Sequence, residues 1–414
     1  MTAPVILCGY AGGLLGPLAA FLLESSVVFV EEPDVVRKRN IRGITAGAPL
    51  LREIVEWEYQ REGAADAFYH RHRDLAPQAV VPISDYSVPF AARLAERYGV
   101  PGAGYGAAVL LRDKRLQRLV TTAAGIPNPP SVPVNGPDEV AAFLAETGGP
   151  IVLKPANRRA SVGTRIVYAA DEVAGAWVEC TDQDEGVFAP DRPRALSMLA
   201  ERYVRGDEYS VEMLVRDGRP VFGAPTRKYL HPGPRPVELG HVHPADIAPE
   251  LARQLVDDTA RVLDAFGMDT GIAHCEWIVE NGQPYLVECG GRMAGDGIIE
   301  LVLVAWQYDI VIEFFNAMRG LPMVEPPPEK APLYCAAWLP AAPPGVVSTV
   351  DGVDQARSMP GVHTCSVTVK VGDEVHPLRS SWDRAAMVTA EGATAAEAID
   401  RARAAAETIV VTVA

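Results

Sequence analysis

The chain has 414 residues, of which 48% are hydrophobic and 22% are charged, as in an ordinary globular protein. Because domains commonly hold about 100–200 residues, this length predicts roughly two to four domains with their own cores. The formal net charge of -15 argues against a nucleic acid or an anionic membrane as partner, since no surplus of basic residues would neutralise phosphates.

The cysteines show no CxxC spacing and lie mostly in apolar runs. They are Cys8, Cys180, Cys275, Cys289, Cys335 and Cys365. This pattern favours buried, reduced thiols over a disulfide framework or a zinc site, and therefore predicts a cytoplasmic protein. Residues 3–23 are apolar, but they lack a basic start and contain several glycines, so we expect a strand, a glycine turn and a helix there rather than a signal peptide.

The first 110 residues alternate β-rich runs (5–8, 26–30, 79–83) with helical stretches such as 88–98. This alternation is typical of an α/β unit with a parallel sheet. The next helices are expected at 112–125 and 138–147. Strands are expected at 151–154, 164–168, 199–204, 208–215 and 220–223. A helix at 250–266, strands at 274–279 and 285–290, and one helix at 297–318 come next.

The proline-rich segment 322–332 is the clearest candidate for a domain boundary, because three consecutive prolines can continue neither a helix nor a central strand. The chain after it mixes β-rich runs at 364–371 and 387–391 with a helix at 395–408. We find neither internal repeats nor low-complexity tracts in the sequence.

Two strand-like segments each place a carboxylate among apolar residues, Glu276 in the first and Glu288 in the second. An ionised glutamate in such surroundings loses solvation unless a cation or hydrogen-bond donors replace the water. The pair therefore suggests a shared divalent ion, and oxygen-only ligation favours Mg²⁺, which commonly accompanies nucleotide phosphates. The alternative for either residue is the solvated face of a half-buried strand.

The turn between these strands decides whether the two carboxylates can share an ion. A two-residue Asn281-Gly282 turn would pair Ile278 with Tyr285 and put Glu276 and Glu288 on opposite faces. A three-residue loop over 280–282, with Gly282 in the left-handed region, would put both on one face. We expect the three-residue loop.

A second constellation suits a nucleotide. Lys154 ends an apolar strand and leads into a small-residue loop with Ser161, which supplies a positive charge and closely approaching backbone N–H groups for phosphates. The stretch 201–212 reads as strand, glycine turn and strand. Its backbone between Glu201 and Val204 could read an adenine edge, while Glu208 accepts ribose hydroxyls. The alternatives are a plain surface turn for the first motif and a solvated strand face for the second.

These motifs, in this order and at this spacing, resemble the ATP-grasp superfamily over residues 100–320. They are Lys114 opening a helix, Lys154 in Leu-Lys-Pro, the stretch 201–212, and Glu276 with Glu288 followed by Arg292. The pattern from Gly361 to Arg384 resembles the tail of the amino-acid ligase and carboxylase branches.

The resemblance implies an α/β ATP-grasp fold in four parts. These are an N-terminal parallel α/β domain (1–112), an ATP-grasp lid subdomain (113–205), a catalytic subdomain (206–325) and a C-terminal α+β subdomain (326–414). It also implies the cofactors ATP and Mg²⁺, with Mn²⁺ as a substitute. ATP contacts are implied for Lys114, Lys154, Ser161, Glu201, Val204, Glu208 and Lys228, and magnesium ligation for Glu276 and Glu288.

The sequence departs from the common ATP-grasp pattern twice. The expected lid, residues 158–163, has Arg158 and Arg159 where many members have glycines, which suggests an arginine-assisted or more rigid lid. Gly290 stands where an Asn usually adds a metal ligand after the second Glu, which leaves the details of magnesium coordination open.

The segment around Glu238 and His241 resembles the L-amino-acid ligases, the dipeptide-forming members of the superfamily. Carried over, Glu238 would bind a substrate ammonium, His241 would lie near the reacting carboxyl, and Arg292 would hold the carboxylate or the transferred phosphoryl group. Asp296 either lines this pocket or caps the following helix. Without the resemblance, His241 would read as an ordinary strand-edge or loop histidine.

The resemblance thus implies an ATP-dependent carboxylate-amine ligase that forms a peptide or amide bond through an acylphosphate. The alternatives are an ATP-grasp carboxylase or phosphoribosyl-type ligase, and a non-catalytic ATP-binding protein. The expected partners are a small-molecule carboxylate and an amine, with no nucleic acid and no membrane, and a homodimer is the default assembly.

Overall fold

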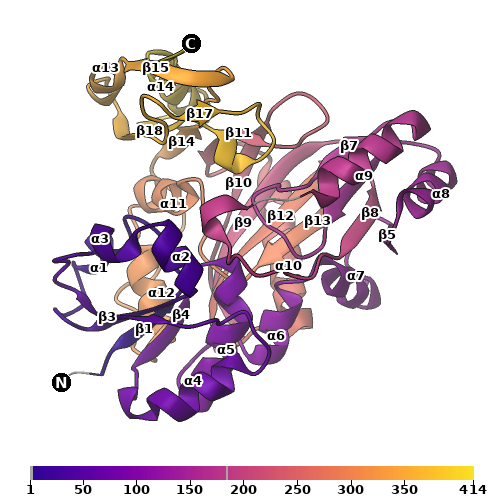
Figure 1. The fold of residues 1–414 in the computed structure, drawn as a ribbon. Coiled ribbons are helices and arrows are strands. Elements are labelled where there is room, and N and C mark those ends of the chain that lie inside the picture. Colours follow the sequence, from indigo (N-terminus) through magenta and orange to yellow (C-terminus); the bar gives the residue numbers. More distant parts are fainter. Residues whose placement is uncertain (1–2, 183–184) are drawn as a thin grey trace.

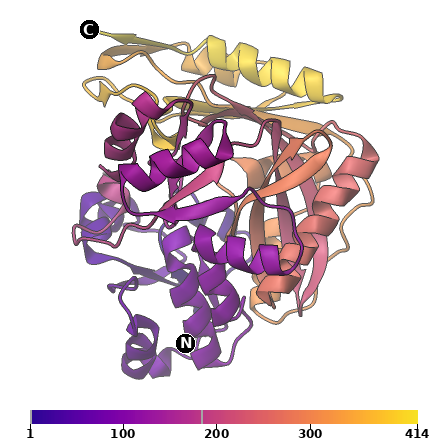
Figure 2. The ribbon, with the colours of Figure 1, turned by 90° about the vertical axis from the view of Figure 1, so that its right-hand side faces the viewer.

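A computed structural model of the chain describes residues 3–182 and 185–414. Residues 1–2 and 183–184 fall within the first and second predicted domains and lie outside the described part. The strands of the described part form sheets of four, four, eight and three strands, and helices from several regions of the chain cover them. The N-terminal sheet lies at one end of the molecule and the C-terminal helix at the other (Figures 1 and 2).

The N-terminal unit is the expected parallel sheet, with strand order β3-β2-β1-β4. Its strands are β1 (Val5–Cys8), β2 (Val27–Glu31), β3 (Leu51–Glu56) and β4 (Ala79–Pro82). Its helices are α1 (Leu15–Leu18), α2 (Pro33–Lys38), α3 (Ile41–Ile44), α4 (Ala64–His72), α5 (Val88–Tyr98) and α6 (Tyr105–Leu110), with 3₁₀ turns η1 (Arg73–Leu75) and η2 (Asp85–Ser87).

Both faces of this sheet are buried, which explains why β1 and β2 read as continuous apolar runs. Ile6 and Val28 pack with Phe68 and Leu94 of α4 and α5. The alternate residues face a second cluster that includes Phe314 and Phe315 from much later in the chain.

The next unit is an antiparallel sheet, β5-β8-β6-β7, with two helices against it. Its elements are α7 (Lys114–Ala123), β5 (Ser131–Val134), α8 (Pro137–Thr147), β6 (Ile151–Pro155), β7 (Arg165–Val167), η3 (Ala170–Glu172), α9 (Val173–Thr181), η4 (Gly186–Phe188) and β8 (Met198–Arg202). Figure 1 shows this unit projecting to one side of the large sheet.

The eight-stranded sheet has the order β13-β12-β9-β10-β11-β14-β18-β16. Its strands are β9 (Asp207–Arg216), β10 (Arg219–Leu230), β11 (Glu238–His243), β12 (Gly271–Glu280), β13 (Gln283–Gly290), β14 (Tyr334–Trp338), β16 (Val362–Val367) and β18 (Ala386–Gly392). Its last three strands follow the proline-rich segment, so the sheet continues across the predicted boundary at residue 326. The four-part division of the chain stays a prediction.

The helices around this sheet are α10 (Pro249–Phe266), α11 (Ile298–Trp306), α12 (Ile310–Met318) and α14 (Ala395–Glu407). The remaining elements are β15 (Gly345–Asp351), α13 (Val353–Arg357), β17 (Glu374–Val375), η5 (Ser381–Asp383) and β19 (Val410–Val413), of which the strands form the sheet β17-β15-β19. No helix of the described residues is long and apolar enough to cross a membrane.

The expectation of a single helix over 297–318 was wrong. Gln307 adopts a left-handed conformation, with φ of 50°, and ends α11. Asp309 then caps α12 by accepting a hydrogen bond from the Ile312 N–H at 2.9 Å. The break lets α12 pack on the N-terminal sheet while α11 contacts the C-terminal strands.

Candidate functional site

All of the site residues predicted from the sequence line one cavity of about 1090 Å³. They are Lys114, Lys154, Ser161, Glu201, Val204, Glu208, Lys228, Glu238, His241, Glu276, Glu288 and Arg292. Since ligand pockets commonly hold about 300–1,000 Å³, this volume can accommodate a nucleotide and a second small molecule together. The cavity brings the predicted residues together, and their individual roles stay predictions.

Glu276 and Glu288 lie directly opposite each other on the paired strands β12 and β13. The predicted three-residue loop was wrong, because Ile278 pairs with Tyr285 around a two-residue turn in which Asn281 and Gly282 both have positive φ. Trp277 pairs with Leu286, but its neighbour Glu276 pairs with Glu288, so the register shifts by one residue at this point. Val287 is left unpaired as a bulge. This extra residue returns both carboxylates to one face.

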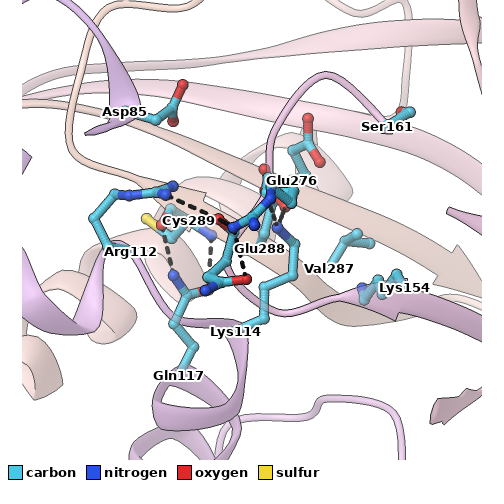
Figure 3. A network of polar contacts seen from close by, with 12 residues as sticks. Asp85, Arg112, Lys114, Gln117, Lys154, Ser161, Glu276, Val287, Glu288 and Cys289 are labelled. Atoms are coloured by element: carbon cyan, nitrogen blue, oxygen red, sulfur yellow. Dashed lines mark hydrogen bonds and ion pairs between the residues drawn. The ribbon is translucent and has the colours of Figure 1, made fainter. Parts of the chain in front are cut away.

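Helix α7 fixes β13 against the site through its first turns (Figure 3). Lys114 forms an ion pair with Glu288. One turn later, Gln117 both donates to the Cys289 carbonyl at 2.7 Å and accepts from its N–H at 2.9 Å. Asp113 caps the helix by accepting from the Arg115 N–H at 2.8 Å. The helix start therefore places Lys114 beside the metal-binding candidates.

Lys154 and Arg118 hold the buried carboxylate of Glu201, at 2.6 and 2.8 Å. Burial alone would raise the pKa of Glu201, but the two cations lower it below its usual value. Glu201, for which the sequence predicted a contact with adenine, therefore holds Lys154 in place on the cavity wall. The adjoining backbone at Val204, together with Val152 and Ile166, lines the same end of the cavity.

Lys228 lies at the centre of three buried carboxylates, 3.3 Å from Glu208, 3.2 Å from Glu238, and ion-paired with Glu276. Burial and the neighbouring acids raise the pKa of Glu208 to about 7, although Lys228 opposes the shift. These three acids could also hold a metal ion, since their oxygens lie within 4.8 Å of one another. The ammonium of Lys228 neutralises that cluster here, Glu276 included, and the assignment of Glu276 and Glu288 to Mg²⁺ stays a prediction.

The donors around Glu276 and Glu288 fit Mg²⁺ as part of a magnesium–nucleotide complex. Both side chains offer only oxygen atoms, and both line a cavity large enough for phosphates to supply further ligands. Gly290 adds no side-chain ligand. A Cβ at Gly290 would lie 3.5 Å from an oxygen of Asp85. The Asp85 carboxylate therefore lies next to the space that a side chain at position 290 would occupy.

His274 is a site residue that the sequence analysis missed. It contacts Glu212 at 2.8 Å with Nδ1 and Glu276 at 3.0 Å with Nε2. Burial would lower the pKa of His274, but the two carboxylates raise it to about 10, so the ring is charged and orients Glu276. The alternation of His274 and Glu276 along one strand face was the available signal.

Asp85 was also missed. It is the first residue of η2, three positions after the end of β4, and so lies near the carboxyl end of a parallel strand, where ligands of such sheets bind. Arg292 donates to Asp85 through Nε at 2.7 Å, and Arg159 of the lid lies 3.8 Å away. Burial opposes ionisation of Asp85, yet these arginines hold its pKa below the usual value. Arg292 is thereby oriented, and its Nη2 atom has no hydrogen bond to a described residue.

Asp296 lines the cavity and does not cap α11, whose cap shows no side-chain hydrogen bond. Arg384 of the C-terminal part donates to Asp296 at 2.8 Å, and His241 lies 3.5 Å from the same carboxylate. Neither ring nitrogen of the buried His241 has a hydrogen-bond partner in the described part of the chain. Ser381 donates to Glu238 at 3.1 Å, so the C-terminal part completes this end of the site.

The lid loop contacts two other segments. Ala160 and Ser161 have φ values of 57° and 56°, and the Ser161 hydroxyl donates to the Pro236 carbonyl at 3.1 Å. The Ser381 N–H donates to the Ala160 carbonyl at 3.2 Å. Both arginines line the cavity, where Arg158 pairs with Glu185 at 3.2 Å and Arg159 faces Asp85.

The expectation of reduced thiols was wrong for one pair of cysteines. Cys275 and Cys289 are directly opposite in the β12–β13 register and form a disulfide. Cys8, Cys180, Cys335 and Cys365 are buried cysteines outside this disulfide, as expected. Separate apolar runs in the sequence gave no sign that two of their cysteines would meet across a hairpin.

Comparisons with known proteins agree with this geometry. An ATP-grasp domain model matches residues 147–300, and an L-amino acid ligase C-terminal domain 2 model matches residues 337–414. An L-amino acid ligase structure from Bacillus licheniformis superposes with a TM-score of 0.79 at 17% identity, covering 100% of this chain and 99% of that one. The fold is therefore that of an ATP-grasp protein.

Relatives in sequence indicate which kind of ATP-grasp protein this chain resembles. The uncharacterized protein y4rH of Sinorhizobium fredii is 28% identical over 72% of this chain and 60% of its own length. The alanine–anticapsin ligase of Bacillus subtilis is 25% identical over 54% of this chain and 50% of its own length. The match thus spans half to three fifths of these relatives. Residues 147–300 are thus an ATP-grasp domain, and the chain as a whole resembles the L-amino-acid ligases.

Proposed function

We propose that this protein is an ATP-dependent ligase that joins the carboxylate of an amino acid to an amine, with ADP and phosphate as the other products. The observation that supports this most directly is one cavity with a lysine-bearing end, two facing carboxylates and a substrate end with Arg292 and His241. The resemblance to amino-acid ligases supports the same reaction.

In the first step, an oxygen of the substrate carboxylate attacks the γ-phosphorus of ATP, and the bond from that phosphorus to ADP breaks. Lys114 and Lys154 exchange their contacts with Glu288 and Glu201 for phosphate oxygens, which fits their position on the cavity wall. Magnesium, held by Glu276 and Glu288 when bound, would neutralise phosphate charge. Arg292, oriented by Asp85, holds the acyl group through its unused Nη2.

In the second step, the amine nitrogen attacks the carbonyl carbon of the acylphosphate, a C–N bond forms, and phosphate leaves. Arg292 stabilises the oxyanion of the tetrahedral intermediate, because its position is set before the reaction begins. His241 accepts the proton that the nitrogen loses, since the residue lines the cavity and the Asp296 carboxylate, 3.5 Å from its Nε2, would stabilise the resulting imidazolium. The lid excludes water, which would otherwise hydrolyse the acylphosphate.

The test is to incubate the purified protein with magnesium-ATP and each of the twenty amino acids, singly and in pairs. ADP and phosphate release would be followed, and products identified by mass. We expect amino-acid-dependent ADP release with a condensed product. ADP release that depends on hydrogencarbonate, or ATP binding without turnover on any acid, would overturn the proposal.

A further inference from the structure

A segment of the unit of β5 to β8 lies on the N-terminal unit. We call residues 186–192, which lie between α9 and β8, the strap. The Asp191 carboxylate of the strap pairs with Arg37 at 2.6 Å and with Lys38 at 2.9 Å, both in α2. The Asp191 N–H also donates to the Asp34 carboxylate at 3.0 Å. The strap is therefore attached to α2 through several charged groups.

Arg192 makes a more buried contact with the same part of the N-terminal unit. Its guanidinium donates to both oxygens of Glu32, at 2.6 and 2.7 Å, and the Glu32 side chain is fully buried just before α2. A two-pronged, charge-assisted contact of this kind is stronger than an exposed ion pair. Lys38 also holds the backbone of the strap, because it donates to the carbonyl oxygens of Gly186, at 2.9 Å, and Ala189.

These contacts hold Phe188 at the cavity. Phe188 lies between the two carbonyl groups that Lys38 binds, and it lines the cavity. Its ring stacks on Trp382 of η5, with ring centroids 4.8 Å apart. The preceding residue, Ser381, donates its N–H to the Ala160 carbonyl of the lid loop. The strap and the lid loop therefore contact the same short element of the C-terminal part.

The attachment between the two units is polar. The unit of β5 to β8 has an apolar core of its own, formed by residues between 132 and 200. Within the described ranges, residues 131–202 contribute nothing to the apolar clusters that contain the N-terminal strands. Units joined by a polar interface move relative to each other more readily than units that share a core. The contacts of the strap can therefore break and re-form while each unit keeps its own core.

We propose that the strap is a releasable clamp, which holds the unit of β5 to β8 against the N-terminal unit while the acylphosphate exists and opens to exchange substrates and products. This inference rests on the proposed ligase function, because the closed cavity would keep water from the acylphosphate. Arg37, Lys38 and Arg192 are not among the residues that line the cavity. Loss of their contacts should therefore change the access of water rather than the chemical steps.

Release of the clamp should uncouple ATP breakdown from product formation. In Arg192→Gln, the ADP released per molecule of condensed product should rise at least about threefold, while KM for ATP stays unchanged. Glu32→Gln/Arg192→Gln removes both charges of the buried pair, so that no carboxylate is left unpaired, and should be uncoupled to the same extent. Arg42→Gln is the matched control, because it loses an ion pair with Glu56 inside the N-terminal unit, and should couple as the wild type does.

Hydrogen–deuterium exchange tests the clamp without turnover. The Asp191 amide is held by its hydrogen bond to Asp34, and it exchanges when the strap leaves α2. In peptides that cover residues 186–192, followed by mass spectrometry, this amide should exchange about tenfold faster in Arg192→Gln and in the double variant. Arg42→Gln should exchange at the rate of the wild type.

The two measurements separate this inference from the ligase proposal. Faster exchange together with unchanged coupling would overturn the role of the strap in excluding water. Unchanged exchange in both strap variants would overturn the clamp itself. A wild type that forms no condensed product with any acid would overturn the ligase proposal, whereas the exchange rates would still decide whether Arg192 holds the strap on the N-terminal unit.

Discussion

At the scale of single residues, the site depends on charges that neutralise one another before any ligand is bound. Lys114, Lys154, Lys228 and Arg292 each contact a buried or half-buried carboxylate. Removing one member leaves its partner with an uncompensated charge in a poorly solvated place. Variants that keep shape while removing charge therefore test function most cleanly.

Glu288→Gln should lower kcat by at least about 100-fold, because the variant loses a metal-binding charge but keeps the side-chain volume. ADP release measures the effect, and circular dichroism with thermal melting checks the fold. Glu391→Gln is the matched control and should be as active as the wild type, because Glu391 is half-buried in β18, pairs with His363 and is not among the residues that line the cavity. Full activity of Glu288→Gln would show that Glu288 is not a required ligand.

Glu31 makes stability depend on pH. Burial, the largest cause, raises the pKa of Glu31 to about 7 from an ordinary value near 4.5. Its stabilising contribution is therefore complete below about pH 4.5 and is lost as the pH rises through 7. Between pH 5 and 8, the wild type should lose about 3 kcal/mol more unfolding free energy than Glu31→Gln, measured by urea denaturation. Parallel stability curves for the two proteins would contradict this assignment.

At the scale of elements, the β9–β12–β13 strands carry the site because their close pairing brings acids from three strands to one face. Gly206, just before β9, lets the chain pass against β12, since a Cβ there would lie only 1.9 Å from the Val279 carbonyl oxygen. Val204 and Glu208, each two positions from this glycine, both line the cavity.

Gly206→Ala should destabilise the fold by about 1–3 kcal/mol, because backbone atoms must move to admit the methyl group. Chemical denaturation measures the change. Gly175→Ala in α9 is the control, since its Cβ meets nothing within 4 Å and alanine favours the helix by up to about 1 kcal/mol. Similar effects of the two substitutions would contradict the steric argument.

At the scale of the whole molecule, the cavity is walled by all of the large units. The N-terminal unit contributes Asp85 and Arg39, the unit of β5 to β8 Lys154 and Arg159, the large sheet Glu276, and the C-terminal part Arg384. A ligand that contacts several of these units should stabilise the folded protein, because it binds only when the units are arranged in this way.

Magnesium-ATP should therefore raise Tm, with a stabilisation of about 2.7 kcal/mol when the ligand is present at one hundred times its Kd. Differential scanning calorimetry with ATP alone, with magnesium alone and with both separates the contributions. Chelation with EDTA should remove the magnesium-dependent part, and Glu288→Gln should reduce it. An unchanged Tm in the presence of both would contradict the assignment of the cavity to a nucleotide.

Much of the site was predictable because its chemistry is local in the sequence. Immediate neighbours in the sequence are enough to recognise a lysine at a helix start, a lysine at a strand end and acids within apolar strands. The order of these motifs then gave the resemblance to the ATP-grasp superfamily. Asp85 and Arg384 were missed because their importance comes from distant partners, whereas His274 was missed although one partner, Glu276, is two residues away. Asp85 acquires its role from Arg292, which lies 207 positions away in the chain, and from Arg159.

The sequence by itself determined the α/β class, the parallel N-terminal sheet and the residues that meet in the cavity, because alternation of apolar residues and the chemical identity of side chains are local properties. The tertiary structure decided the rest. The bulge at Val287, the Cys275–Cys289 pair and the break at Gln307 depend on register and on packing between distant segments. A one-residue shift turns a strand's side chains to the opposite face, and only the pairing of complete strands and helices selects the shift that is realised.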